Sequence, residues 1–233
     1  MKIKKDILTD FLKKINMDGN EKIEEALFNF TESGLKISAV TPSKINRVDA
    51  TLKTSAFISY EAIEKIGVQD ITTLIKIIGK FSDEIELIVE GNIIKLKDGN
   101  KEMTTELIDV QFITAVKDMK ELEFDDSFTI KVEKIKSAID DASINGEYNL
   151  EFKTGEKAFQ ISTSGKYKFK RNYIVEEANG GVEVAFGEPL VNAVKNLTGK
   201  IELNLKSNFP AKILEKTEHS IISLIVSPRI KSD

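Results

Sequence analysis

The sequence contains no cysteine, no tryptophan and only one histidine, His219. Without cysteine there can be no disulfide framework, no thiolate metal site and no cysteine nucleophile. That absence fits a reducing compartment, and the first residues, MKIKKDILTD, lack the long apolar stretch of a secretory signal. The most apolar late run, residues 221–226, is too short to span a membrane. We therefore expect a cytoplasmic protein.

Motifs for catalysis and cofactor binding are also missing. A lone histidine in EKTEHSII more often lies in a solvated turn than in a catalytic site. Gly-Lys occurs three times, but Ser or Thr never follows it, so there is no phosphate-binding P-loop. Acidic pairs such as Asp125-Asp126 have no histidine or third carboxylate at ligand spacing. We expect no enzymatic activity, no cofactor and no bound metal.

The composition is that of an ordinary globular protein. Hydrophobic residues make up 41% of the 233 residues and charged residues 31%, which permits one large domain or two small ones. The net charge of −4 does not by itself suggest a nucleic-acid partner.

Two hydrophobic periods alternate along the chain. Stretches such as 24–40 and 148–163 alternate apolar and polar residues on either side of a turn, as strand pairs do. Apolar residues at helical spacing predict four helices, over 6–17, 70–80, 132–143 and 188–197.

The order of these elements repeats. Ile85-Glu86-Leu87 follows the second helix and Ile201-Glu202-Leu203 follows the fourth, and each tripeptide begins a pair of strands. We expect an α+β fold of two similar domains, each with two helices packed on antiparallel sheets. The predicted domains are 1–109 and 127–233, joined by a connector over 110–126.

Lysine is prominent on the helix faces opposite the apolar ones. Stepping 100° per residue places Lys13 there in the first helix, and Lys76 and Lys80 in the second. A solvated helix face would look similar, but the two lysines lack acidic residues four positions away within the predicted second helix, 70–80. In an acidic chain this pattern indicates that lysines and carboxylates are sorted onto different surfaces.

Two segments resemble the DNA sliding clamps of the proliferating cell nuclear antigen family. VTPSKINRVDATL (40–52) is similar to a proline-containing segment of that family, and FPAKILEKTEHSIISLIVSPRI (209–230) resembles its last hairpin. The matching residues are Pro42, Ser43, Ile45, Val48, Leu52, Pro210, Pro228, Arg229 and Ile230.

The resemblance implies a trimeric ring, of identical or paralogous subunits, whose helices face duplex DNA without reading its sequence. It also implies docking of polymerase, clamp loader, nuclease and ligase through short peptide motifs, in the nucleoid or, in a eukaryote, in the nucleus. DNA-facing residues would be Lys13, Lys14, Lys76, Lys80, Lys134, Lys136, Lys195 and Lys200. A partner-peptide pocket would comprise Val40, Ile45, Arg47, Leu122, Phe124, Pro210, Ile225 and Pro228. A subunit interface would pair the edge near 101–109, with Glu102, Glu106 and Asp109, with the edge near 165–174, with Lys166, Lys168 and Lys170.

The chain departs from the family pattern in the second domain. Ser137, Asp140, Asn192 and Asn196 occupy helix positions that the family usually makes more basic, so this half of the wall should hold DNA less strongly. Arg47 stands where an apolar pocket residue is usual. Alternatives are a subunit of a heterotrimeric, checkpoint-type or viral clamp, and an α+β enzyme whose site carries no recognised motif.

Overall fold

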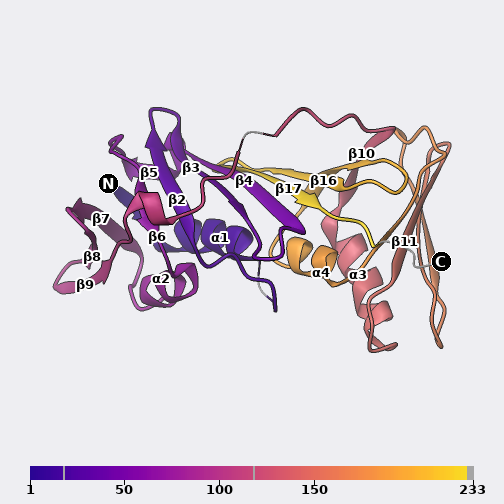
Figure 1. The fold of residues 1–233 in the computed structure, drawn as a ribbon, viewed down its shortest axis with the longest axis horizontal. Coiled ribbons are helices and arrows are strands. Elements are labelled where there is room, and N and C mark those ends of the chain that lie inside the picture. Colours follow the sequence, from indigo (N-terminus) through magenta and orange to yellow (C-terminus); the bar gives the residue numbers. More distant parts are fainter. Residues whose placement is uncertain (18, 118, 230–233) are drawn as a thin grey trace. The chain divides into compact units, whose positions relative to one another are not determined.

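The computed structural model describes residues 1–17, 19–117 and 119–229, so Ile230 lies outside the described residues. The chain forms two compact units (Figure 1). Most of the first unit precedes Lys117 and most of the second follows it. Two short segments cross this division: Ser43–Arg47 belongs to the second unit and Lys216–Ile222 to the first.

The first unit has two helices and two sets of strands. One sheet has the order β5-β1-β7-β8-β9, and β6, β2, β3 and β4 are neighbours in another. The elements are β1 (Lys2–Lys4), α1 (Lys5–Asn16), β2 (Ala26–Thr31), β3 (Gly34–Val40), β4 (Asn46–Lys53), η1 (Thr54–Ala56), β5 (Phe57–Ser59), β6 (Ile66–Val68), α2 (Ile71–Ile78), β7 (Glu84–Glu90), β8 (Ile93–Asp98), β9 (Lys101–Glu106) and η2 (Val110–Phe112).

The second unit repeats this plan with fewer strands. One sheet has the order β13-β12-β11-β14, and β10, β15 and β16 are neighbours in another. The elements are β10 (Asp126–Lys131), α3 (Val132–Ser143), β11 (Leu150–Gly155), β12 (Ala158–Thr163), β13 (Lys170–Ile174), β14 (Glu183–Phe186), α4 (Glu188–Val194), β15 (Lys200–Leu205) and β16 (Ala211–Lys216). The last strand, β17, spans Ser220–Val226.

The sequence repeat becomes the same strand pair in both units. Ile3 of β1 lies opposite Ile85 of β7, and Ile130 of β10 lies opposite Ile201 of β15. All four side chains are buried. In each unit a helix follows the first of these strands directly, which gives α1 and α3 the same starting point. The predicted α+β fold with a half-chain repeat is therefore confirmed.

The four predicted helices are present, and each buries its apolar face. In α1 the buried face contains Leu8, Phe11, Leu12 and Ile15, at the spacing expected of a helix packed on one side. Figure 1 shows α1 and α2 close together in the first unit, and α3 and α4 close together in the second.

The last predicted helix ends earlier than its apolar period suggests. The period extends to residue 197, but α4 ends at Val194. The Leu197 N–H donates to the Val194 carbonyl at 3.2 Å, which closes a turn three residues apart instead of continuing the helix. Gly199, two residues later, has a positive φ of 68°. Leu197 lies in this non-helical segment and is fully buried. Its apolar side chain therefore extends the helical spacing in the sequence, although the residue is not part of the helix.

The buried carboxylate of Asp126 fixes a loop of the second unit. Asp126 is 2% exposed, and its oxygens accept hydrogen bonds from the backbone N–H groups of Asn179 and Gly180, both at 3.1 Å. Gly180 has a φ of 95°, and a Cβ on it would lie 2.9 Å from the Gly155 carbonyl carbon, so another residue would be strained there. One side chain thus anchors the loop that leads into β14.

We expect Asp126→Ala to destabilise the protein by about 1–3 kcal/mol, because both loop N–H groups lose their acceptor. Chemical denaturation measures the change. Asp125→Ala is the matched control: Asp125 is exposed and lies 3.8 Å from Lys206, so its removal should change stability by less than about 0.5 kcal/mol. Equal effects of the two substitutions would show that Asp126 does not anchor the loop.

Candidate functional site

The helices of the first unit present lysines to solvent. Lys13 on α1, Lys76 on α2 and Lys80 just after α2 are all exposed. The α2 helix begins at an N-cap in which Asp70 accepts a hydrogen bond from the Thr73 N–H at 2.7 Å. Hydrogen bonds from Thr73 lower the pKa of Asp70, so this cap is ionised at neutral pH.

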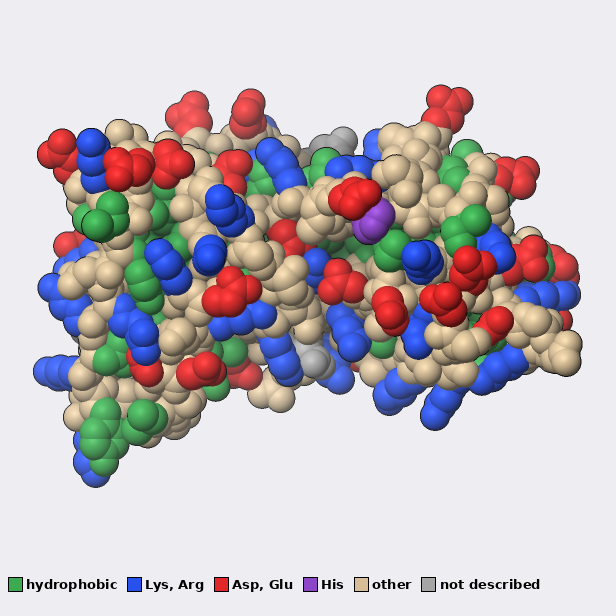
Figure 2. Space-filling view, turned by 180° about the vertical axis from the view of Figure 1, so that it is seen from behind, with side chains coloured by type: hydrophobic (Ala, Val, Ile, Leu, Met, Phe, Trp, Pro, Cys, Tyr) green, Lys and Arg blue, Asp and Glu red, His purple; other side chains and the backbone are tan. Residues whose placement is uncertain are grey.

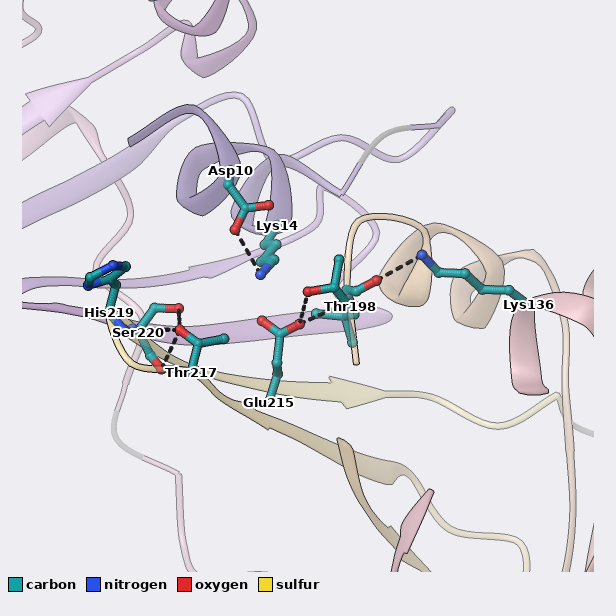
Figure 3. A network of polar contacts seen from close by, with 9 residues as sticks. Asp10, Lys14, Lys136, Thr198, Glu215, Thr217, His219 and Ser220 are labelled. Carbon is teal, nitrogen blue, oxygen red and sulfur yellow. Dashed lines mark hydrogen bonds and ion pairs between the residues drawn. The ribbon is translucent and has the colours of Figure 1, made fainter. Parts of the chain in front are cut away.

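Lys14 is predicted to face DNA, and the structure does not support this. It is 2% exposed, and its Nζ lies 2.9 Å from the Asp10 carboxylate one helical turn earlier (Figure 3). The position beside the apolar centre of α1 lies inside the packed face. A buried, paired ammonium is not available to a phosphate, so Lys14 does not belong to the exposed lysines.

In the second unit, two of the predicted lysines are engaged within the protein. Lys136 donates to the carbonyl oxygens of Lys195 and Leu197 at 2.7 and 2.8 Å, just beyond the end of α4. Figure 3 shows the Lys136 ammonium directed at the segment beside Thr198. The ammonium of Lys134 lies 4.9 Å from the centre of the Tyr173 ring. Lys195 and Lys200 are exposed.

The charge on the molecular surface is mixed. Figure 2 shows one face, on which lysine, arginine, aspartate and glutamate side chains are interspersed. The expected sorting of lysines from carboxylates is thus not seen on the scale of that face. At α2 the sorting holds locally, because this helix carries Lys76 and no carboxylate.

A hollow of about 580 Å³ lies on the second unit, and two predicted pocket residues, Ile45 and Pro228, line it. It is formed by segments that are distant in the sequence. The Ser227 N–H donates to the Ile45 carbonyl at 3.0 Å, which joins the end of the chain to the 43–47 segment. The Asn46 side chain donates to the Pro189 carbonyl at 3.0 Å, which fixes the same segment to the start of α4.

Sequence reasoning missed several residues of this hollow. Tyr148, Pro189 and Arg229 also line it. Arg229 is held by its backbone N–H, which donates to the Ala185 carbonyl at 2.7 Å, and by its guanidinium, which donates to the Tyr148 carbonyl at 3.3 Å. Arg229 could have been found, because it follows Pro228 in a segment already singled out. Nothing in the sequence pairs Tyr148 with that segment.

The other predicted pocket residues do not line this hollow. Val40, Arg47, Leu122 and Pro210 are half-buried, and a partner role for them stays a prediction. Phe124 is also half-buried, and its ring packs edge-on against Phe209 with centroids 6.2 Å apart.

Ile225 is predicted as a pocket wall, with Leu224 and Val226 in the core. It retains only 8% exposure, whereas its two neighbours are fully buried. The alternation of faces along β17 therefore leaves Ile225 only slightly exposed, and its role as a pocket wall stays a prediction.

Each unit has a strand at an open sheet edge where the subunit interface was predicted. β9 ends its sheet and displays Glu102 and Glu106, both exposed, while Asp109 caps the short helix η2 through the Gln111 N–H. Glu102 also forms an ion pair with Lys97 at 3.0 Å.

β13 ends the other sheet, but it covers only residues 170–174 of the predicted edge. Lys170 is exposed on the strand, whereas Lys166 and Lys168 are exposed in the loop before it. Ile174 at its end is 79% exposed. Arg171 is held inward by Asp141 at 2.6 Å, an interaction that also raises the pKa of Arg171.

The backbone of His219 takes part in a hydrogen-bonded turn. It lies in the turn before β17, where its N–H donates to the Thr217 hydroxyl and its carbonyl accepts from the Lys53 N–H at 2.9 Å (Figure 3). Within the described residues, no cluster of three His, Asp or Glu side chains could hold a metal. No helix in the described part of the chain is long and apolar enough to cross a bilayer.

Comparison with known proteins gives a consistent result over almost the whole chain. No family model matches it. A DNA polymerase sliding clamp of Methanococcus maripaludis (strain S2) is 26% identical over 246 residues, with 96% of each chain covered. That of Pyrococcus furiosus is 28% identical over 179 residues, or 73% of this chain and 70% of the relative.

Solved structures establish the fold. The structure of the C-terminal region of FEN-1 bound to Archaeoglobus fulgidus PCNA has a TM-score of 0.89 at 24% identity and covers 100% of this chain and 98% of its own. The PCNA2–PCNA3 complex from Sulfolobus tokodaii has a TM-score of 0.81 at 20% identity, covering 98% and 99%. The chain is thus similar over nearly its full length to archaeal DNA polymerase sliding clamps, and it has the fold of the solved proliferating cell nuclear antigen structures.

Proposed function

We propose that the chain is the subunit of a sliding clamp: a non-enzymatic ring that encircles duplex DNA and tethers replication and repair proteins to it. The observation that carries the proposal is the pair of open sheet edges, β9 and β13, which bear opposite charges. A cellular clamp of this kind would act in the nucleoid of the cytoplasm, or in a nucleus.

The two edges are complementary. An edge strand has unpaired N–H and C=O groups and is a liability unless another strand covers it. Glu102 and Glu106 flank one edge, and Lys166, Lys168 and Lys170 flank the other, so β9 of one copy can pair with β13 of the next. Such a head-to-tail interface generates a ring if the rotation closes. Because both edges belong to one chain, copies of this chain satisfy the pairing without a paralogue.

The hollow beside Ile45 is the proposed docking site for partner peptides. It combines the apolar side chains of Ile45, Pro189 and Pro228 with polar groups, which belong to Glu147, Tyr148, Glu188, Ser227 and Arg229. A concave site with a few polar groups among apolar ones suits a short peptide. The Archaeoglobus fulgidus relative binds the C-terminal region of a nuclease, FEN-1, and we propose that this chain binds tails of the same kind.

The ring interface is tested by charge reversal. Lys168→Glu with Lys170→Glu should shift the protein from trimer towards monomer, because two like-charged edges would then meet. Light scattering over a range of concentrations measures the mass. Lys36→Glu with Lys65→Glu makes the same change in net charge at exposed positions of the first unit and should leave the trimer intact.

A compensating change sharpens this test. Adding Glu102→Lys and Glu106→Lys to the Lys168 and Lys170 variant restores opposite charges across the interface and should restore the trimer. A trimer that withstands the first reversal, or a monomer that the second does not rescue, would show that β9 and β13 do not pair.

The docking site is tested at Ile45, which is half-buried. Ile45→Glu should keep the thermal midpoint within a few degrees but abolish calorimetric binding of a synthetic FEN-1 tail peptide, since a carboxylate would replace an apolar lining. Ile45→Val should retain binding. Val226→Glu should unfold the protein, because Val226 is fully buried and an unpaired buried charge costs several kcal/mol. Normal peptide binding by the folded Ile45→Glu protein would exclude this hollow as the docking site.

A further inference from the structure

We propose that binding of DNA is asymmetric within each subunit: the helices of the first unit hold the phosphates, and those of the second contribute little. The inference rests on the proposed function and specifies which helices perform it. It follows from what the lysines and carboxylates of the four helices do within the protein.

The lysines of α2 are available. Lys76 and Lys80 are exposed, and neither side chain forms an ion pair with any residue in the described part of the chain. Lys76 lies on the last turn of α2, and Lys80 lies in the turn that directly follows the helix. Hydrogen bonds from Thr73 and, to a lesser extent, the charge of Lys76 lower the pKa of Asp70, but neither ammonium has an ion pair within the described residues to give up before it binds a phosphate.

The lysines of α3 are committed. Lys136 donates hydrogen bonds to two carbonyl groups beyond α4, those of Lys195 and Leu197. To reach a phosphate it would have to leave both unsatisfied. Lys134 lies against the Tyr173 ring, whose hydroxyl donates to the Lys134 carbonyl at 3.1 Å. Burial raises the pKa of Tyr173, so its hydroxyl stays protonated as a donor at neutral pH.

Carboxylates lie near the remaining lysines of the second unit. A hollow of about 440 Å³ between α3 and α4 is lined by Lys195 together with Asp140 and Glu188. Glu133 accepts from the Gly199 N–H at 3.2 Å, next to Lys200. These acidic groups oppose an approaching phosphate and offset the two exposed ammonium groups.

The overall charge of the helices follows the same division. α1 carries three lysines and two aspartates, and α2 carries one lysine and no carboxylate. α3 carries two lysines and three carboxylates, and α4 carries one glutamate and no lysine. Because affinity for duplex DNA comes mainly from neutralised phosphates, the helices of the first unit should dominate its salt dependence.

Matched pairs of substitutions test the proposal. Lys76→Ala with Lys80→Ala and Lys195→Ala with Lys200→Ala each remove two exposed positive charges. Binding of a short fluorescent duplex is followed by anisotropy at several salt concentrations, and light scattering confirms that each variant is still a trimer. The first pair should weaken binding and make the slope of log K against log salt shallower by about 0.9 for each phosphate that is no longer neutralised. The second should leave the slope nearly unchanged.

A third variant tests the repulsive part of the proposal. Asp140 is exposed on α3, and Asp140→Lys should make the salt slope steeper, because it adds a cation where the proposal places an opposing charge. Equal weakening by the two lysine pairs, with wild-type binding intact, would overturn the asymmetry while leaving the clamp function in place. A trimeric wild-type protein with no salt-dependent duplex binding would overturn the proposed function and this inference with it.

Discussion

The unpaired edges of two sheets are the constraint on which the proposed assembly depends. β9 and β13 each end a sheet, and each leaves backbone donors and acceptors without a strand beside them. A short or strongly charged edge resists indiscriminate pairing, and here the two edges carry opposite charges. The same charges that keep identical edges apart therefore favour the pairing of unlike edges, which is what a closed ring of copies requires.

Closure of such a ring would give the helices their function. In each unit, one face of each helix is buried, so only the opposite face can meet a ligand. The lysines on these opposite faces differ in whether they interact with other groups of the protein. Lys76 and Lys80 remain exposed, whereas Lys136 donates hydrogen bonds to carbonyl groups just beyond α4 and Lys134 packs on Tyr173. Two units with the same architecture thus present different surfaces.

The sequence predicted the elements well because each depends on a local pattern. The apolar period located all four helices, and the repeated tripeptide predicted the equivalent strands β7 and β15. What it could not predict depends on interactions between distant residues or on the depth of packing. Lys14 is buried beside Asp10, and Leu197 extends an apolar period beyond the end of its helix. The hollow likewise joins Ile45 to Tyr148 and Pro228. A resemblance supplied two of its residues, but no periodicity relates the three segments.

The native mass of the wild-type protein tests the central claim most directly. Sedimentation equilibrium at several concentrations should give one species close to three times the subunit mass of 26.1 kDa. The proposed ring has three copies, and head-to-tail pairing of β9 with β13 leaves no free edge once the ring has closed. A monomer at every concentration would contradict the account. A mass that grows with concentration without reaching a limit would contradict it too, since it would show that the edges pair but the ring does not close.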